Sequence, residues 1–305
     1  MGYTEAMKTL ERLPKPVNVA RVPHRSPFRY PGGKTWLVPD VRAWLHSRAS
    51  RPDTFCEPFA GGGIVGLTVA FERLAERVVM VELDEQVAAV WLTILEEGGA
   101  QWLAGRITRY QPTAESVREL LSQPASDTRE RAFQTIVKNR TFHGGILANG
   151  SSLTKNGENG KGIRSRWYPE TLARRILAIG KIRQRIAFRH GDGMEHIQAG
   201  LDDEGSVWFL DPPYTASAKG AGSRLYTHSE LDHERLFGLA SRLRGDFMLT
   251  YDNAPRVREM AADHGFDLAL VAMRNTHNAT MAELVIGRDL DWLREKRVVA
   301  PTLPL

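Results

Sequence analysis

The sequence predicts an α/β protein that is built on a parallel β-sheet with crossover helices. Short apolar runs of strand type alternate with longer helical patterns in residues 53–98 and again in residues 186–273, and this alternation is typical of a parallel sheet. Of the 305 residues, 42% are hydrophobic, which is enough to bury a large core. The middle of the chain interrupts the alternation, so we expect an α/β domain with an insertion.

Each predicted element rests on a run of this kind. In the first stretch, a strand in DTFCEPF is followed by a helix in IVGLTVAFERLAER, a strand in VVMVEL and a helix in DEQVAAVWLTILEEG. In the second stretch, the strands are IAFRHGD, VWFLD, DFMLTYD and FDLALVAM, and the helices are SELDHERLFGLASRLRG and PRVREMAADHG. Continuous apolar runs bounded by Gly, Pro, Asp or Asn are typical of buried strands.

The predicted insertion, residues 98–183, is mostly helical and then opens into the Gly-, Asn- and Ser-rich segment GGILANGSSLTKNGENGKG. The sequence therefore divides into an N-terminal extension (1–25), an α/β domain in two pieces (26–97 and 184–290), the insertion and a C-terminal tail (291–305). The tail ends in VVAPTLPL, which has no helical or strand pattern.

Basic residues are concentrated in one part of the chain. Between Lys138 and Arg189 there are twelve Lys and Arg residues against two acidic ones, whereas the whole chain carries a net charge of +5. A mildly acidic body with one basic segment is the pattern of a protein that contacts a nucleic-acid backbone. For the residues from Arg174 to Arg185, a solvated helix face is the simpler explanation. The loop that follows GGIL is harder to explain in this way.

The composition argues against several classes of protein. Cys56 is the single cysteine, so an intrachain disulfide and a multi-cysteine zinc site are excluded, and a reducing cytoplasm fits best. Histidines such as His190 and His196 lack a completing ligand pattern, so we expect no metal site. No stretch reaches membrane-spanning length, and the N-terminus has no signal-peptide core.

A glycine-rich turn, EPFAGGG (residues 57–63), follows the first strand and leads directly into a helix. Glycines let the backbone approach a ligand closely, and a helix N-terminus offers free N–H groups. The next strand ends in Glu82, where an acid can bind ribose hydroxyls in nucleotide-binding folds. We therefore expect a ligand with an adenosyl group, and a helix cap shared with Asp84 is the alternative for Glu82. The spacing differs from G-x-G-x-x-G, which disfavours a nicotinamide cofactor.

The tetrapeptide Asp211-Pro212-Pro213-Tyr214 closes the strand in VWFLD. Two prolines remove backbone N–H donors and hold the preceding residues extended, so the turn is stiff and presents carbonyl groups beside a carboxylate. In an open α/β sheet, ligands bind beyond the carboxyl ends of the strands. This position favours a functional site, and the alternative is an ordinary proline turn with Asp211 as a local cap.

Upstream, Tyr30 and Lys34 bring an aromatic ring and a cation to the glycine turn of FRYPGGKTW. Such a pair suits a ligand that carries a carboxylate, and a surface hairpin is the alternative. A phosphate-binding loop is excluded, because the glycine that it requires would fall at Phe28.

Seven short motifs occur in the order FRYPGGK, EPFAGGG, VELD, HGD, DPPY, LTYDN and AELVI, with the basic segment inserted among them. In this combination the chain resembles the Dam-type adenine-specific DNA methyltransferases of the alpha group, from about Ser26 to Gly287. The resemblance implies a Rossmann-like methyltransferase sheet, S-adenosylmethionine (SAM) as cofactor, double-stranded DNA as partner and a target-recognition domain in the insertion.

The resemblance also implies roles for individual residues. Cofactor contacts would come from Tyr30 and Lys34 to the methionine carboxylate, from Glu57, Phe59, Gly61 and Gly63 to the methionine and sulfonium, from Glu82 to the ribose, and from Asp192 to the adenine, with Asp211 alongside. DNA contacts would come from Asn139 and Arg140 and from the loop cations Lys155, Lys161, Arg164 and Arg166.

With adenine as the target, the tetrapeptide gains a chemical role. The exocyclic amine of adenine is a poor nucleophile because its lone pair is delocalised into the ring, so an enzyme must accept its N–H hydrogens. Asp211 and the Pro212 carbonyl are two acceptors at a separation that Pro213 helps to fix, and such preorganisation requires no rearrangement when the amine arrives. Tyr214 would stack on a base that is flipped out of the duplex.

Alternative functions fit parts of the same pattern. N4 methylation of cytosine needs the same acceptors, although its motif more often begins with serine, and RNA is a further candidate substrate. A DNA-binding module without a cofactor and a dinucleotide-dependent oxidoreductase come from other classes. A partner restriction endonuclease is compatible with a DNA methyltransferase, but the sequence does not identify one.

Overall fold

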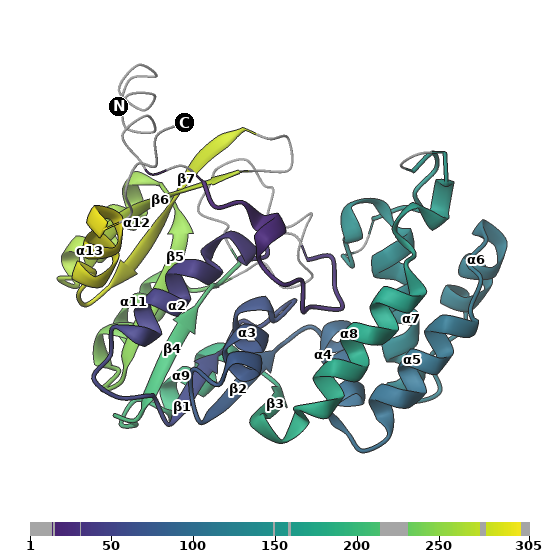
Figure 1. Cartoon of the computed structure of the whole chain (residues 1–305), viewed down its shortest axis with the longest axis horizontal. Coiled ribbons are helices and arrows are strands. Elements are labelled where there is room, and N and C mark those ends of the chain that lie inside the picture. Colours follow the sequence, from purple (N-terminus) through teal and green to yellow (C-terminus); the bar gives the residue numbers. More distant parts are fainter. Residues whose placement is uncertain are drawn as a thin grey trace.

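The computed structural model describes residue 14 and residues 16–30, 32–148, 150–157, 160–213, 231–274 and 279–299. Its centre is a seven-stranded sheet with the order β3-β2-β1-β4-β5-β7-β6 (Figure 1). The strands are β1 (Thr54–Glu57), β2 (Arg77–Glu82), β3 (Ile186–His190), β4 (Ser206–Leu210), β5 (Asp246–Asp252), β6 (Asp267–Arg274) and β7 (Thr280–Gly287). The first five are parallel, and β7 runs antiparallel to both β5 and β6. The predicted Rossmann-like α/β sheet is confirmed, and the antiparallel β7 is a feature that the alternation does not predict.

Helices cover both faces of the sheet. They are α2 (Val38–His46), α3 (Ile64–Glu72) and α13 (Asp291–Val299) on one face, and α9 (Gly193–Ala199), α11 (His233–Arg242) and α12 (Pro255–Asp263) on the other. Each face has its own hydrophobic cluster. Neighbouring strand residues point to opposite faces, so Phe55 packs in the cluster with α2 and α3, and Cys56 packs in the cluster with α9 and α11. Burial on both faces explains why the central strands are almost continuously apolar.

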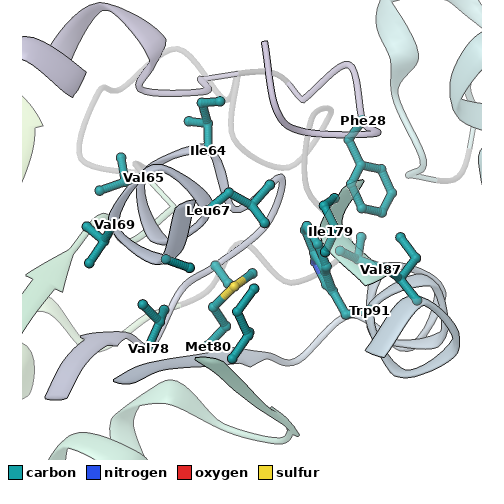
Figure 2. Packing of buried hydrophobic residues seen from close by; sticks show 14 of the residues in the cluster. Phe28, Ile64, Val65, Leu67, Val69, Val78, Met80, Val87, Trp91 and Ile179 are labelled. Carbon is teal, nitrogen blue, oxygen red and sulfur yellow. The ribbon is translucent and has the colours of Figure 1, made fainter. Parts of the chain in front are cut away.

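The segment between β2 and β3 forms a layer of helices beside the sheet, to the right in Figure 1. These helices are α4 (Glu85–Leu95), α5 (Gly99–Arg109), α6 (Ala114–Ser122), α7 (Thr128–Thr141) and α8 (Pro169–Lys181). Helix α4 packs against α5, α7 and α8. Trp91 of α4 and Ile179 of α8 belong to the same buried cluster as Leu67 and Met80 of the α/β part (Figure 2). The insertion is helical as expected, but it shares its core with the sheet, and the predicted boundary at residue 98 divides its helical layer.

Both predicted terminal segments contain packed structure. The expected C-terminal tail is wrong for residues 291–299, which form α13 against α2. Leu290, just before this helix, and Leu293 within it are buried, and Lys296 Nζ forms an ion pair of 2.5 Å with Asp40 Oδ1 of α2. In the predicted N-terminal extension, Val22 is buried in the main core, so the end of the extension is part of the fold.

Candidate active site

Acidic residues stand at the carboxyl ends of four neighbouring strands, on one edge of the sheet. Glu57 and Glu82 are the last residues of β1 and β2, and Asp192 and Asp211 follow β3 and β4 closely. Parallel strands bring their carboxyl ends to one edge, and all four acids line one cavity there. The predicted site residues that line this cavity are Tyr30, Lys34, Glu57, Phe59, Gly63, Glu82, Asp192, Asp211, Pro212 and Pro213.

The turn after β1 requires glycine for both its conformation and its packing. Gly61 and Gly63 have φ angles of +47° and +60°, and residues other than glycine rarely adopt such backbone angles. A Cβ atom on Gly62 would lie 2.8 Å from Tyr30 Cβ, and one on Gly63 would lie 2.5 Å from Met80 Cε. Tyr30 therefore packs against the turn, and the turn itself has no room for side chains.

Glu57 is a buried carboxyl group at the base of the cavity. It is 4% exposed, and its Oε2 accepts a hydrogen bond of 2.8 Å from the Gly66 N–H of α3. Burial, with the nearby carboxylates of Asp211 and Glu82, raises the pKa of Glu57 to about 8. A positive charge nearby favours the ionised form of such a group. The site is therefore suited to a cationic ligand.

Glu82 fastens the glycine turn to the loop that precedes α4. Its Oε2 accepts a hydrogen bond of 2.7 Å from Gly61 N, and its Oε1 accepts one of 2.8 Å from Asp84 N. Burial raises the pKa of Glu82 to about 7. Asp84 alone is the N-cap of α4, since its side chain accepts the N–H groups of Gln86 and Val87. The alternative of a shared helix cap therefore does not describe the role of Glu82.

Asp192 and Phe59 lie where the turns after β3 and β1 meet. Asp192 accepts a hydrogen bond of 2.7 Å from Met194 N and so caps α9. A Cβ atom on Gly193 would lie 2.1 Å from the Pro58 carbonyl oxygen and 3.0 Å from the Phe59 ring. The two turns are thus in direct contact along the wall of the cavity.

Asp211 is held by two neighbouring residues beside the proline turn. Thr250 Oγ1 of β5 donates a hydrogen bond of 2.7 Å to Asp211 Oδ1, and Lys34 Nζ forms an ion pair of 3.0 Å with the same oxygen. These contacts fix the carboxylate at the edge of the cavity, next to Pro212. Tyr214 lies outside the described residues.

Lys34 is engaged by protein carboxylates. It is 3% exposed, and its Nζ lies 3.6 Å from Glu283 Oε2 of β7 in addition to its contact with Asp211. Its Nζ also donates a hydrogen bond of 3.0 Å to the Gly32 carbonyl, so a carboxylate from a ligand would have to compete with three groups of the protein. The geometry favours a role of Lys34 in orienting Asp211 over the expected contact with the methionine carboxylate.

Two residues of this network, Thr250 and Glu283, have no role assigned from the sequence. Burial raises the pKa of Glu283 to about 7, although the nearby Lys34 ammonium lowers it. Glu283 is opposite Asp252 in the antiparallel pairing of β7 with β5. The signal in the sequence is an acidic residue inside an apolar strand, because such residues are rarely buried without a function or a partner.

Asn139 and Arg140, expected near DNA, are buried where α7 meets the N-terminal segment. Asn139 is fully buried, and its side chain accepts from Arg29 N and donates to the carbonyl groups of Arg29 and Gly145. Arg140 is 6% exposed and donates a hydrogen bond to the Pro27 carbonyl. Both N–H groups of the Asn139 amide are used in these bonds, so none is left for a phosphate. Asn139 therefore connects α7 to the N-terminal segment.

The four loop cations stay candidates for DNA contact. Lys155, Lys161 and Arg164 are exposed, and Arg166 is half-buried. Residues Gly162–Arg166, which begin at the last glycine of the glycine-rich segment, form a 3-10 helix that packs against α7, so Arg164 and Arg166 lie on a defined element.

The described part of the chain has neither a metal-binding cluster nor a membrane-spanning helix. Among these residues, no group of three or more His, Cys, Asp or Glu side chains is arranged to hold a metal ion. Within the same ranges, no helix has the length and apolar character needed to cross a membrane.

Comparisons with known proteins identify the family. The family model of the D12 class N6 adenine-specific DNA methyltransferases matches residues 30–274. A solved structure with similarity to this chain is the rRNA methyltransferase AviRa from Streptomyces viridochromogenes, with 15% identity, a TM-score of 0.39, and 87% of this chain and 89% of that chain covered. Another is a precorrin-6y C5,15-methyltransferase from Geobacter metallireducens, with 12% identity, a TM-score of 0.34, and 81% and 87% covered. A search of curated proteins finds no match. Because the family model spans most of the chain, including the four acids at the strand ends, this protein belongs to the D12 class of N6 adenine-specific DNA methyltransferases.

Proposed function

We propose that this adenine-specific DNA methyltransferase uses SAM as its methyl donor and acts on an adenine that is flipped out of the duplex into the cavity. The observation that carries the proposal is the Asp211 carboxylate, which Thr250 and Lys34 fix beside the Pro212 turn. The cavity lined by this acid also contains Glu57 and Glu82. The donor and the target base would therefore meet in one cavity.

The residues around the glycine turn fit SAM. Glu57 is buried and Glu82 is partly buried, and burial raises the pKa of the two carboxyl groups to about 8 and about 7. SAM carries a sulfonium cation and ribose hydroxyls that match them. We assign the sulfonium side to Glu57 and Phe59, the ribose to Glu82 and the cofactor adenine to Asp192. When bound, SAM supplies a methyl group that its sulfonium has already activated.

The protein has to make a weak nucleophile reactive. The N6 lone pair of adenine is delocalised into the ring, and acceptors for both N–H hydrogens favour a tetrahedral nitrogen. The Asp211 carboxylate and the Pro212 carbonyl are such acceptors, and Thr250 and Lys34 fix the position of the carboxylate before the substrate arrives. The amine gains a methyl group and loses one proton, and Asp211 is the base that would accept this proton.

The target base and the duplex need further contacts. We assign the face of the flipped adenine to Tyr214, because an aromatic ring next to the acceptors can stack on a base. For the duplex, the exposed cations of the insertion offer contacts to the phosphate backbone. These cations are Lys155, Lys161 and Arg164, with Arg166 at the end of the same segment.

Product analysis tests this proposal. The protein is incubated with SAM that carries a labelled methyl group, in parallel with mixed-sequence duplex DNA and with RNA, and the nucleosides are analysed by mass spectrometry after digestion. We expect labelled N6-methyladenine from the DNA alone. Labelled methylcytosine as the only product would contradict the adenine assignment. No labelled product on either nucleic acid would favour a binding module without catalysis.

A further inference from the structure

Glu283 is an acidic residue inside an apolar strand. Its neighbours across the sheet are Asp252 of β5 and Val271 of β6, and its side chain is 15% exposed. Carboxyl groups are rarely buried to this extent without a partner or a function. Glu283 Oε2 lies 3.6 Å from Lys34 Nζ, and the same oxygen has no hydrogen-bond partner in the described part of the chain. Its charge is therefore compensated through the ion pair with Lys34.

Lys34 is shared between two carboxylates. Its Nζ lies 3.0 Å from Asp211 Oδ1 and donates a hydrogen bond of 3.0 Å to the Gly32 carbonyl, in addition to its ion pair with Glu283. The lysine is 3% exposed, so it cannot exchange these partners for bulk water without moving. Interactions between charges are stronger away from bulk water. A change of charge at one carboxylate therefore alters how strongly Lys34 binds the other.

Glu283 is not itself a wall of the active-site cavity. Lys34 and Asp211 line this cavity, whereas Glu283 is not among the described residues that do so. A base in the cavity would meet Asp211, and Glu283 is connected to this carboxylate through Lys34. The contact that links the buried acid to the reacting atoms is therefore the Lys34 ammonium.

The charge of Glu283 decides how far Lys34 neutralises Asp211. When Glu283 is protonated, Asp211 is the charged partner of the ammonium in this trio. When Glu283 is ionised, it competes for the ammonium and adds a negative charge near Asp211. A carboxylate that is less neutralised is a stronger acceptor of a hydrogen bond and of a proton.

Glu283 changes its charge near neutral pH. Burial raises its pKa to about 7, and the Asp211 and Asp252 carboxylates add to the rise while the Lys34 ammonium opposes it. Burial also raises the pKa of Asp252, and His233 of α11 opposes this rise. Glu283 is therefore mainly protonated below about pH 7 and mainly ionised above it, and Asp252 is the neighbour from which its titration has to be distinguished.

We propose that Glu283 is a positioning residue for methyl transfer, whose charge acts through Lys34 to control how strongly the Asp211 carboxylate accepts the target amine. This inference rests on the proposed function, because it takes Asp211 to be the acceptor of that amine. It gives a role to a buried acid outside the cavity. It also predicts that methyl transfer becomes faster as this acid ionises.

The test compares the full chain with Glu283→Gln, which keeps the shape of the neutral side chain and cannot ionise. Glu295→Gln, at an exposed position of α13, is the matched control. The rate of methyl transfer is measured in a single turnover at saturating SAM and DNA, so that product release does not contribute. The wild type and the control should become faster with a midpoint near pH 7, by up to about tenfold. Glu283→Gln should keep the low-pH rate of the wild type throughout.

A purely structural role of Glu283 would give a different result. It would change the rate by the same factor at every pH, so parallel pH profiles of the wild type and Glu283→Gln would overturn the proposal. Asp252→Asn removes a like charge and should move the step to lower pH without abolishing it. A step that persists in Glu283→Gln and disappears in Asp252→Asn would assign the titration to Asp252 and would also overturn the proposal.

A second measurement does not depend on methyl transfer. In protein with ¹³C-labelled carboxyl groups, the NMR signal of Asp211, identified by its loss in Asp211→Asn, should shift in step with the titration of Glu283. This step should be present in the wild type and in Glu295→Gln and absent from Glu283→Gln. If Glu283→Gln does not fold, a wild-type Asp211 signal without a step near pH 7 overturns the proposal by itself.

The two measurements separate this inference from the proposed function. If the Asp211 signal follows Glu283 but the protein forms no methyladenine, the proposed function fails and the electrostatic link between the two acids stands. If methyladenine forms while the Asp211 signal and the pH profile are insensitive to Glu283, the proposed function stands and the positioning role fails.

Discussion

The wild-type protein should become less stable as the pH rises, and replacing Glu57 by glutamine should remove this pH dependence. In the folded protein, burial raises the pKa of this carboxyl from 4.5 to about 8. Between these values the unfolded chain has released the proton and the folded chain has kept it. The unfolded state is therefore favoured progressively as the pH rises from about 4.5 to about 8. A glutamine cannot titrate, and its side-chain oxygen can still accept the Gly66 N–H.

The size of the effect follows from the pKa change. A tenfold change in proton affinity corresponds to about 1.4 kcal/mol. A rise from 4.5 to about 8 therefore corresponds to about 5 kcal/mol. This is a large part of the free energy of unfolding of a typical domain, which is about 5 to 15 kcal/mol. The pKa of Glu82 is also raised. Glu82 is present in both proteins, so its contribution to the pH dependence largely cancels in the comparison.

Urea unfolding at about pH 5 and about pH 9 measures the difference. Between these values, the free energy of unfolding of the wild type should fall by about 4 kcal/mol more than that of Glu57→Gln, because part of the change already occurs below about pH 5. Glu195→Gln, at an exposed position of α9, should follow the wild type. Parallel pH profiles for wild type and Glu57→Gln would refute the reasoning. In the same series, SAM should bind the wild type more tightly as the pH passes about 8, because a cation favours the ionised carboxylate; Glu57→Gln should lack this gain.

Three further outcomes are expected. Glu82→Ala should weaken SAM binding, measured by calorimetry, before it lowers turnover at saturating SAM, and an unchanged SAM affinity would remove Glu82 from the cofactor site. Tyr214→Phe should keep most of the activity while Tyr214→Ala loses about 1 to 3 kcal/mol of target-base binding, and equal damage from both would mean that the hydroxyl group matters. Single alanine substitutions in the basic loop should each flatten the salt dependence of DNA affinity by about 0.9 without changing sequence preference, and a loop whose variants all match the wild type would be a solvated surface. The loop positions are Lys155, Lys161, Arg164 and Arg166.

The acids of the site could be predicted because they depend on short-range patterns. Glu57, Glu82 and Asp211 each end or follow an apolar strand, and a parallel sheet brings such positions to one edge whatever the loops between them do. The glycine turn was predictable for the same reason, since the backbone angles of Gly61 and Gly63 are a local property. Alternation of strands and helices is therefore sufficient to locate the cavity.

The partners of these residues could not be predicted, because they come from distant parts of the chain. Lys34 has a suitable charge for a ligand carboxylate, but the fold brings it to Asp211 and Glu283. Asn139 and Arg140 occur in a basic segment, yet α7 turns them inward against the backbone around Pro27 and Arg29. A net charge in the sequence says nothing about which face of a helix carries it.

The C-terminal region differs from the expectation for a related reason. The segment VVAPTLPL predicts a tail, but Leu290 and Leu293, just before and inside α13, are buried in the core of the sheet domain and hold this helix against it. β7 lies between β5 and β6 and runs antiparallel to both. The connection from β6 to β7 is too short for a crossover, so this pair has to be antiparallel, whereas the insertion of β7 beside β5 depends on contacts that the strand pattern does not encode.

The central claim is that Asp211 accepts the target amine and does not bind the cofactor, and a paired measurement on Asp211→Asn tests it most directly. Thr250 can still donate to the asparagine oxygen, so the turn should keep its shape, while the charged acceptor is lost. Turnover on DNA at saturating SAM should fall by about a hundredfold or more, and SAM affinity, measured by calorimetry on the same preparation, should remain that of the wild type. Asp202→Asn, at an exposed position before β4, should change neither quantity. Turnover equal to that of the wild type would contradict the assignment, and a loss of SAM affinity would make Asp211 a cofactor ligand instead.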